Sequence, residues 1–242
     1  MTSKPLDVCF TVDVEPDCPP YLNGFRGVEE GMPRLLAMLA EEGVPATFFT
    51  TGDVARRNPE VISAVVSQGH ELASHGTTHR AFTAMTRDEA REEIEQAAAV
   101  LRCFAPVTSF RAPYLRFPSE YVDLLAESGF LVDSSTAKYK RARGRRQRAG
   151  GSIRCIPASV TSSVLRLPRL LREAYLRSLG SPVVLFVHPW EFVDLRRERL
   201  RIDCRFRTGE VGLACVRDVL RSLRQRGARF HTVRDYCTLI GA

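Results

Sequence analysis

Short apolar runs alternate along the chain with longer segments in which apolar residues recur at helical spacing. The runs at 8–14, 46–50 and 182–187 are rich in β-branched and aromatic residues and have the length of buried strands. The segment 29–43 is typical of an amphipathic helix, because Pro33 falls in its first turn and Gly43 follows its last residue. The pattern therefore predicts repeated strand–helix units.

Capping signals extend this pattern through the rest of the chain. Asn58 followed by Pro59 predicts the start of a helix, and Thr86 with Glu89 has the spacing of a capping box at the start of another. Further helices are expected at 118–128 and 210–226, and further strands at 71–74, 107–110, 130–132, 152–156 and 229–233.

Repeated strand–helix alternation predicts an α/β fold with a parallel sheet, either a barrel or a doubly wound sheet. The barrel is favoured because polar residues follow the ends of several different predicted strands. In α/β barrels catalytic groups collect at that rim. These residues are Asp13, His75, Arg111, Asp133 and His188. The glycine-rich loops of nucleotide-binding folds do not occur in the sequence.

A candidate metal site is visible in the spacing of two segments. His75 and His79 stand four residues apart, and Asp13 and Glu15 stand two apart on a predicted strand, so both carboxylates point to one face. Two imidazoles and one carboxylate are the ligands of a catalytic zinc or a related divalent ion. The second carboxylate would then be free to act as a base.

Composition and cysteine usage suggest a reducing compartment. Seven cysteines are scattered without a C-x-x-C pair, which is typical of free thiols. Acidic residues within the first twenty positions argue against a signal peptide, and the apolar runs fall short of the roughly 18 residues that span a bilayer. We therefore expect a cytoplasmic protein.

The formal charge of +7 is concentrated locally, in a basic run at 138–148 and an arginine-rich stretch at 196–207. Such runs are either solvated loops or surfaces that attract phosphate on a ligand, a lipid surface or nucleic acid. No recognition helix, zinc finger or aromatic RNA-binding motif accompanies them, so nucleic acid is not the expected partner. Peripheral membrane contact through 138–148 remains open.

Five motifs occur in a fixed order along the chain: FTVDVEPD, SHGTTH, FRAPY, VDSS and LFVHPWEF. In this order the sequence resembles the polysaccharide deacetylase family, carbohydrate esterase family four. The resemblance implies a distorted (β/α) barrel with about seven parallel strands, forming a single catalytic domain over 1–242. It also implies a metal-dependent hydrolase that removes acyl groups from sugars.

The resemblance assigns a role to each motif residue. Asp13 matches the catalytic base, and Arg111 matches the arginine that orients it. The backbone N–H of Tyr114 matches the oxyanion donor. His188 resembles the general acid, and Asp133 the carboxylate that steadies that acid. His75 and His79 match the two metal-binding histidines.

The first motif departs from the family pattern at one position. Most members have two adjacent aspartates, the second of which binds metal, whereas Val14 occupies that position here. We therefore assign the metal carboxylate to Glu15, with Asp17 as the alternative. This D-x-E form resembles a subgroup of the family, and residues 25–39 are similar to deformylases that act on undecaprenyl-phosphate-linked aminoarabinose.

The sequence thus predicts an enzyme that removes an acetyl or formyl group from an amino sugar. The basic charge and the absence of an export signal leave open a substrate that carries phosphate or a lipid phosphate. Zinc is the default metal, and manganese, cobalt and nickel suit the same ligands. Two alternatives remain: hydrolysis of a non-sugar amide or cyclic imide on the same fold, and a non-catalytic barrel that binds phosphate or nucleic acid.

Overall fold

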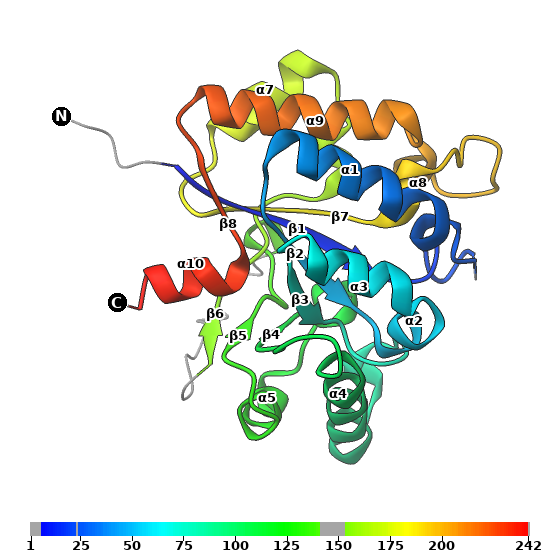
Figure 1. The fold of residues 1–242 in the computed structure, drawn as a ribbon, viewed down its shortest axis with the longest axis vertical. Coiled ribbons are helices and arrows are strands. Elements are labelled where there is room, and N and C mark those ends of the chain that lie inside the picture. The colour runs from blue at the N-terminus through cyan, green and yellow to red at the C-terminus, as the bar shows by residue number, and fades with distance from the viewer. Residues whose placement is uncertain (1–5, 23, 141–152, 242) are drawn as a thin grey trace.

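A computed structural model describes residues 6–22, 24–140 and 153–241, and its centre is a curled sheet of parallel strands (Figure 1). Seven strands follow the order β6-β5-β4-β3-β2-β1-β7, and the short β8 pairs with the beginning of β1. All of the strand pairs are parallel. The predicted distorted barrel with about seven parallel strands is therefore confirmed.

The strands are β1 (Asp7–Val14), β2 (Ala46–Thr50), β3 (Glu71–Ser74), β4 (Ser109–Phe110), β5 (Val132–Asp133), β6 (Arg154–Cys155), β7 (Val183–Val187) and β8 (Arg229–His231). The α-helices are α1 (Met32–Glu42), α2 (Gly52–Arg57), α3 (Pro59–Ser67), α4 (Arg87–Leu101), α5 (Val122–Glu127), α6 (Ser162–Leu165), α7 (Arg169–Arg177), α8 (Ile202–Arg205), α9 (Glu210–Gln225) and α10 (Val233–Leu239). A π-helix, η1 (Gly27–Gly31), leads into α1, and short 3-10 turns include η3 (Pro113–Leu115) and η6 (Pro189–Phe192).

Strand register aligns the ends of the strands at one edge of the sheet. Val14 pairs with Thr50, Thr50 with Ser74, Ser74 with Phe110, and Phe110 with Asp133. The residues that follow these pairs therefore leave the sheet side by side. Since side chains alternate between faces along a strand, this register brings polar groups from distant parts of the chain to one rim.

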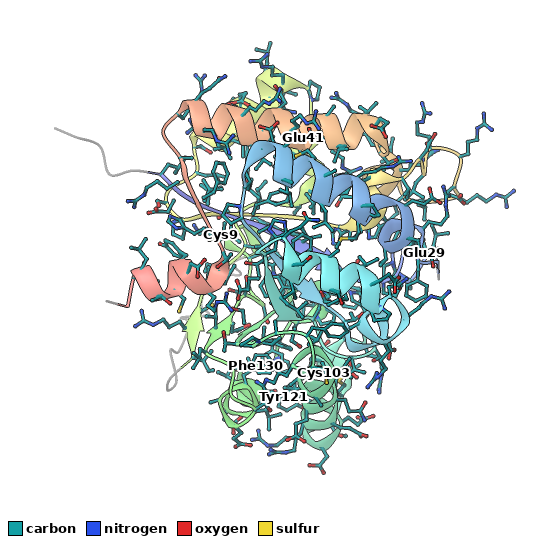
Figure 2. The ribbon with its side chains drawn as sticks, in the orientation of Figure 1. Cys9, Glu29, Glu41, Cys103, Tyr121 and Phe130 are labelled. Atoms are coloured by element: carbon teal, nitrogen blue, oxygen red, sulfur yellow. The ribbon has the colours of Figure 1, made fainter. Side chains whose placement is uncertain are left out.

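Two layers of apolar side chains hold the strands in place. The larger cluster joins β1 and β7 to α1 and α9, which lie next to each other on one side of the sheet (Figure 1). A second cluster lies beneath α4 and α5, where Figure 2 labels Phe130 and Tyr121. Because β1, β2 and β7 are buried along nearly their whole length, their sequences are rich in apolar residues, whereas the equally buried β3 begins with Glu71 and ends with Ser74.

Most local signals in the sequence correspond to observed structure. The Thr86–Glu89 capping box is present at the start of α4, and Asn58 does precede α3, although its side chain makes no capping hydrogen bond. The strand predicted at 107–110 is shorter, and most of the basic run 138–148 lies outside the described residues. No helix within the described ranges has the length and apolar character needed to cross a bilayer.

Candidate active site

Three side chains converge at the rim where β1 and β3 end. The ligand atoms of Glu15, His75 and His79 all lie within 4.8 Å of one another, and all three residues are buried. Nε2 of His79 lies 2.5 Å from Oε2 of Glu15, and Nε2 of His75 lies 3.4 Å from the same oxygen. The candidate metal-binding residues predicted from the sequence therefore meet at one point.

The donor geometry of this cluster fits a divalent cation. Nε2 of His75 and both ring nitrogens of His79 are buried, and none makes a hydrogen bond of ordinary geometry within the described residues. Buried polar groups without partners are uncommon in folded proteins, and donors that converge on one space are what an ion requires. A carboxylate and two imidazoles are ligands that zinc and its neighbours in the first transition row accept.

Hydrogen bonds from neighbouring segments hold the two histidines and the turn between them in place. Nδ1 of His75 lies 2.7 Å from the carbonyl oxygen of Arg111, so Nδ1 donates to this acceptor and Nε2 faces Glu15. His79 has a positive φ of 61°, a left-handed conformation that is uncommon for a residue with a side chain. Oε1 of Glu93, on α4, accepts hydrogen bonds from the backbone N–H groups of Thr77 at 2.8 Å and Thr78 at 2.6 Å. Glu93 therefore holds the turn that separates the two imidazoles.

A buried ion pair lies beside this cluster. Nη1 of Arg111 lies 2.6 Å from Oδ1 of Asp13, and the Arg111 side chain is fully buried. The same guanidinium donates to the hydroxyls of Thr11 and Ser134 and stacks over the Phe49 ring. Because the guanidinium is anchored on several sides, it holds the Asp13 carboxylate in a fixed orientation.

His188 follows β7 on the other side of Glu15. Its Nε2 lies 3.8 Å from Oε1 of Glu15, and its Nδ1 lies 2.8 Å from Oε1 of Glu191. Burial alone would lower the pKa of His188, but the charges of Glu15 and Glu191 outweigh burial and raise this pKa to about 9. The two carboxylates therefore favour the protonated form of the imidazole, as a proton donor requires.

Glu191 is itself buried and fixed by a second ion pair. Burial would raise the pKa of Glu191, but the guanidinium of Arg166, 3.1 Å from Oε2, and the contact with His188 lower it. Arg166 is 2% exposed and donates to the carbonyl oxygens of Asp203 and Phe206. His188, Glu191 and Arg166 therefore form a continuous chain of contacts, in which Glu191 and Arg166 are buried and His188 is partly exposed.

Two expectations from the sequence need correction here. Asp133 was expected to steady His188, but its Oδ1 accepts the backbone N–H of Ser135 at 2.8 Å, and the carboxylate against Nδ1 of His188 is that of Glu191. Asp17 was the alternative metal ligand, but its two oxygens accept the backbone N–H groups of Arg26 and Gly27. Asp17 therefore closes a loop and lies outside the ligand cluster.

Tyr114 and Trp190 complete the surroundings. Tyr114 has a positive φ of 61°, is 42% exposed, and its ring meets the His79 ring edge-on. Strained conformations of this kind are concentrated at functional sites. Trp190 stacks on His188 and points Nε1 toward Glu15 at 3.4 Å, but it is only 5% exposed. Trp190 therefore packs behind the site and is not an open sugar platform.

Glu191 is the functional candidate that the sequence analysis missed. It stands three residues after His188 in HPWE, and the tight turn of η6 bends its carboxylate back to both the backbone N–H and the ring of His188. A carboxylate three residues after a polar residue at a strand end is the signal that could have identified it.

Comparisons with known proteins point to one family. The sequence profile described as polysaccharide deacetylase matches residues 3–132, more than half of the chain. A chitooligosaccharide deacetylase from Sinorhizobium fredii is 36% identical over 103 residues, which cover 41% of this chain and 48% of that protein. A peptidoglycan deacetylase from Helicobacter pylori is 31% identical over 115 residues, which cover 46% of this chain and 39% of that protein. The chain therefore spans about half of these relatives' length or less.

A solved structure extends the similarity to nearly the whole chain. A protein from Mycobacterium smegmatis assigned to the polysaccharide deacetylases superposes with a TM-score of 0.72 at 25% identity, over 96% of this chain and 88% of that one. The fold beyond residue 132, which carries His188 and Glu191, is thus shared with this protein.

Proposed function

Since the chain belongs to the polysaccharide deacetylase family, we propose that it is a metal-dependent hydrolase that removes an N-acyl group from an amino sugar. The observation that carries this proposal is the convergence of Glu15, His75 and His79 between the Asp13–Arg111 pair and His188. A metal-ligand set, a carboxylate base and a protonated imidazole are the three elements that hydrolysis of an amide requires.

Each residue has a defined task in the proposed reaction. Glu15, His75 and His79 would hold the cation, which when bound would polarise the acyl carbonyl and acidify the attacking water. Asp13, aimed by Arg111, would take a proton from that water, a step typically worth about 10²–10⁴-fold.

The remaining tasks concern the oxyanion and the leaving group. The backbone N–H of Tyr114 would donate to the oxyanion that develops on the acyl oxygen, and one such donor is typically worth about 3 kcal/mol. His188 would donate the proton on Nε2 to the departing sugar amine, because a free amide anion is too basic to leave unprotonated. Asp133 would have no part in the reaction and would only hold its own turn through the backbone N–H of Ser135.

The substrate is part of the same proposal. The names of the relatives indicate N-acetylated glycans, either chitooligosaccharides or peptidoglycan. The D-x-E form of the first motif and the segment 25–39 support a narrower reading: an amino sugar linked to phosphate or lipid phosphate, carrying an acetyl or formyl group. The net charge of +7 is consistent with such an anionic substrate. We further propose one catalytic domain over 1–242, a cytoplasmic location, and zinc as metal, with manganese, cobalt and nickel as substitutes.

Release of acetate and formate tests this proposal. The protein, loaded separately with each of the four metals, is given N-acetylated chitin oligomers, peptidoglycan fragments and phosphate-linked formylated amino sugars. Ring opening of a cyclic imide serves as the comparison reaction. We expect release of acetate or formate from an amino sugar, and this release should stop when a chelator removes the metal. Imide opening without acyl release from any sugar would contradict the proposed substrate class.

A further inference from the structure

Helix α7 exposes more apolar surface than an ordinary surface helix. Its inner side buries Leu176 in the core and Arg172, which pairs with Asp218 of α9, while Leu170 is 85% exposed and Leu171 is 62% exposed. Tyr175 lies on the same outer side and is 37% exposed. Positions 170, 171, 174 and 175 form one helical face, so the exposed apolar residues are contiguous. An exposed apolar stripe of this kind normally meets a partner.

Both ends of α7 carry an exposed positive charge. Arg169 begins α7 and Arg177 ends it, and both side chains are exposed. Glu173 is the one acidic residue of α7; its side chain is 14% exposed and accepts a hydrogen bond from Ser222 of α9. The outer face of α7 therefore combines leucines and a tyrosine with arginines, and its acidic residue is turned inward.

A second segment also exposes apolar residues. Arg166, which precedes α7, donates to the carbonyl oxygens of Asp203 and Phe206. In that segment Ile202 is 72% exposed and Phe206 is 42% exposed.

Tyr139 and Lys140 stand at the described end of the basic run. Burial raises the pKa of Tyr139 to about 12, and the charges of Asp13 and Tyr175 add to that rise. Tyr139 is 39% exposed, and Nζ of the adjacent Lys140 donates to the carbonyl oxygen of Tyr114 at 2.9 Å. Tyrosines next to basic residues are typical of the boundary between water and lipid headgroups.

We propose that the outer face of α7, formed by Leu170, Leu171 and Tyr175 and flanked by Arg169 and Arg177, docks on the surface of an anionic lipid bilayer. Leucines would enter the headgroup boundary while the arginines contact lipid phosphates. The same face is poorly suited to a second copy of the chain. A two-fold pairing of α7 helices would bring the arginines of both copies together, and like charges across an interface are repulsive. This docking is a property of the surface and does not depend on the proposed hydrolysis.

Vesicle sedimentation tests the proposal on the full chain without substrate. The probes are phosphatidylcholine vesicles with and without phosphatidylglycerol. We expect binding only to the anionic vesicles, with a partition coefficient that falls about tenfold to a hundredfold in the Leu170→Gln/Leu171→Gln variant. Arg169→Gln and Arg177→Gln should each weaken binding about fivefold.

The matched control is Leu239→Gln/Ile240→Gln, at the end of α10, well apart from α7 (Figure 1). Leu239 is 48% exposed and Ile240 is 49% exposed, so the change in apolar character is similar. Binding by this variant should equal that of the unaltered protein. Equal loss in both double variants, or no loss in either, would overturn the assignment of the face to α7.

A spectroscopic arm reports insertion directly. Trp190, the one tryptophan of the chain, is buried, so a Leu171→Trp variant adds an exposed emitter on the α7 face. We expect its emission to shift to shorter wavelength with anionic vesicles, whereas that of Leu239→Trp stays unchanged. An unshifted Leu171→Trp signal with bound vesicles, or a concentration-dependent dimer in sedimentation velocity that Leu170→Gln/Leu171→Gln abolishes, would refute lipid docking.

Discussion

Replacing Glu191 by glutamine should separate the proton donor from the rest of the site. The substitution keeps the size of the side chain but removes the charge that lies 2.8 Å from Nδ1 of His188. The imidazolium is then less favoured, so the pKa of His188 should fall. As pH rises, activity should therefore begin to decline at a lower pH than in the unaltered protein. General acid catalysis typically contributes about 10²–10⁴-fold, and we expect kcat for an N-acetyl sugar to fall about 10²-fold.

The same substitution has a calculable cost in stability. Arg166, 2% exposed, would face a neutral amide in place of a carboxylate 3.1 Å away. Breaking a buried ion pair by removing one partner typically costs about 3–5 kcal/mol. Because carbonyl oxygens still accept from Arg166, we expect the lower end, a loss of about 3 kcal/mol and roughly 6–12 °C in Tm. Activity should therefore be measured well below that transition, after circular dichroism confirms the fold.

The leaving group provides the decisive comparison. The leaving group of an aryl acetate is a weakly basic phenolate, which needs no proton to depart. Hydrolysis of this ester should therefore be nearly insensitive both to Glu191→Gln and to His188→Ala. In the His188→Ala background, Glu191→Gln should cause no further loss with the amide substrate. An equal fall with amide and ester, or a further loss in the double variant, would refute the role assigned to Glu191.

Three further predictions concern the supports of the site and the fold. Glu93→Ala leaves the backbone N–H groups of Thr77 and Thr78 without their acceptor, so metal affinity should fall about 10–100-fold by isothermal calorimetry, whereas the exposed Glu95→Ala should not change it. Gly27→Ala places a Cβ 2.4 Å from the backbone nitrogen of Trp190 and should destabilise by about 1–3 kcal/mol in urea, whereas Gly180→Ala, with open space around it, should be nearly neutral. Burial would raise the pKa of Asp7, but the contacts with His231 and Arg229 together outweigh burial and lower it. The contribution of Asp7 to the free energy of unfolding should therefore be complete above its ordinary pKa and lost as pH falls through the lowered value. The stability difference between the unaltered protein and Asp7→Asn should therefore shrink between about pH 5 and pH 2, and a constant difference would contradict this linkage.

Strands such as β1, β2 and β7 were predictable because strands buried in a parallel sheet are rich in apolar residues. The expected 46–50 and 71–74 coincide with β2 and β3, and the rim position of Glu15, His75 and Arg111 follows from register alone. Strands such as β4 and β5 contain two residues each, too few for a periodic signal, so their bounds were less well placed.

The elements that sequence reasoning missed depend on contacts between distant segments. Helix α7 carries leucines on its exposed side and a buried arginine, so its pattern does not predict which face packs. Glu191 gains its role only because Arg166, far away in sequence, supplies the compensating charge. Asp133 stands at a strand end like the other site residues, but its own turn takes up its carboxylate, and no pattern of spacing distinguishes these cases.

Metal content tests the central claim most directly. Elemental analysis after loading and dialysis should find about one equivalent of divalent metal in the unaltered protein, in Asp13→Asn and in Asp17→Asn. His75→Ala, His79→Ala and Glu15→Gln should each lose it, because each removes one of three converging ligands. Full metal content in all three ligand variants, or loss in Asp17→Asn with retention in Glu15→Gln, would contradict the site.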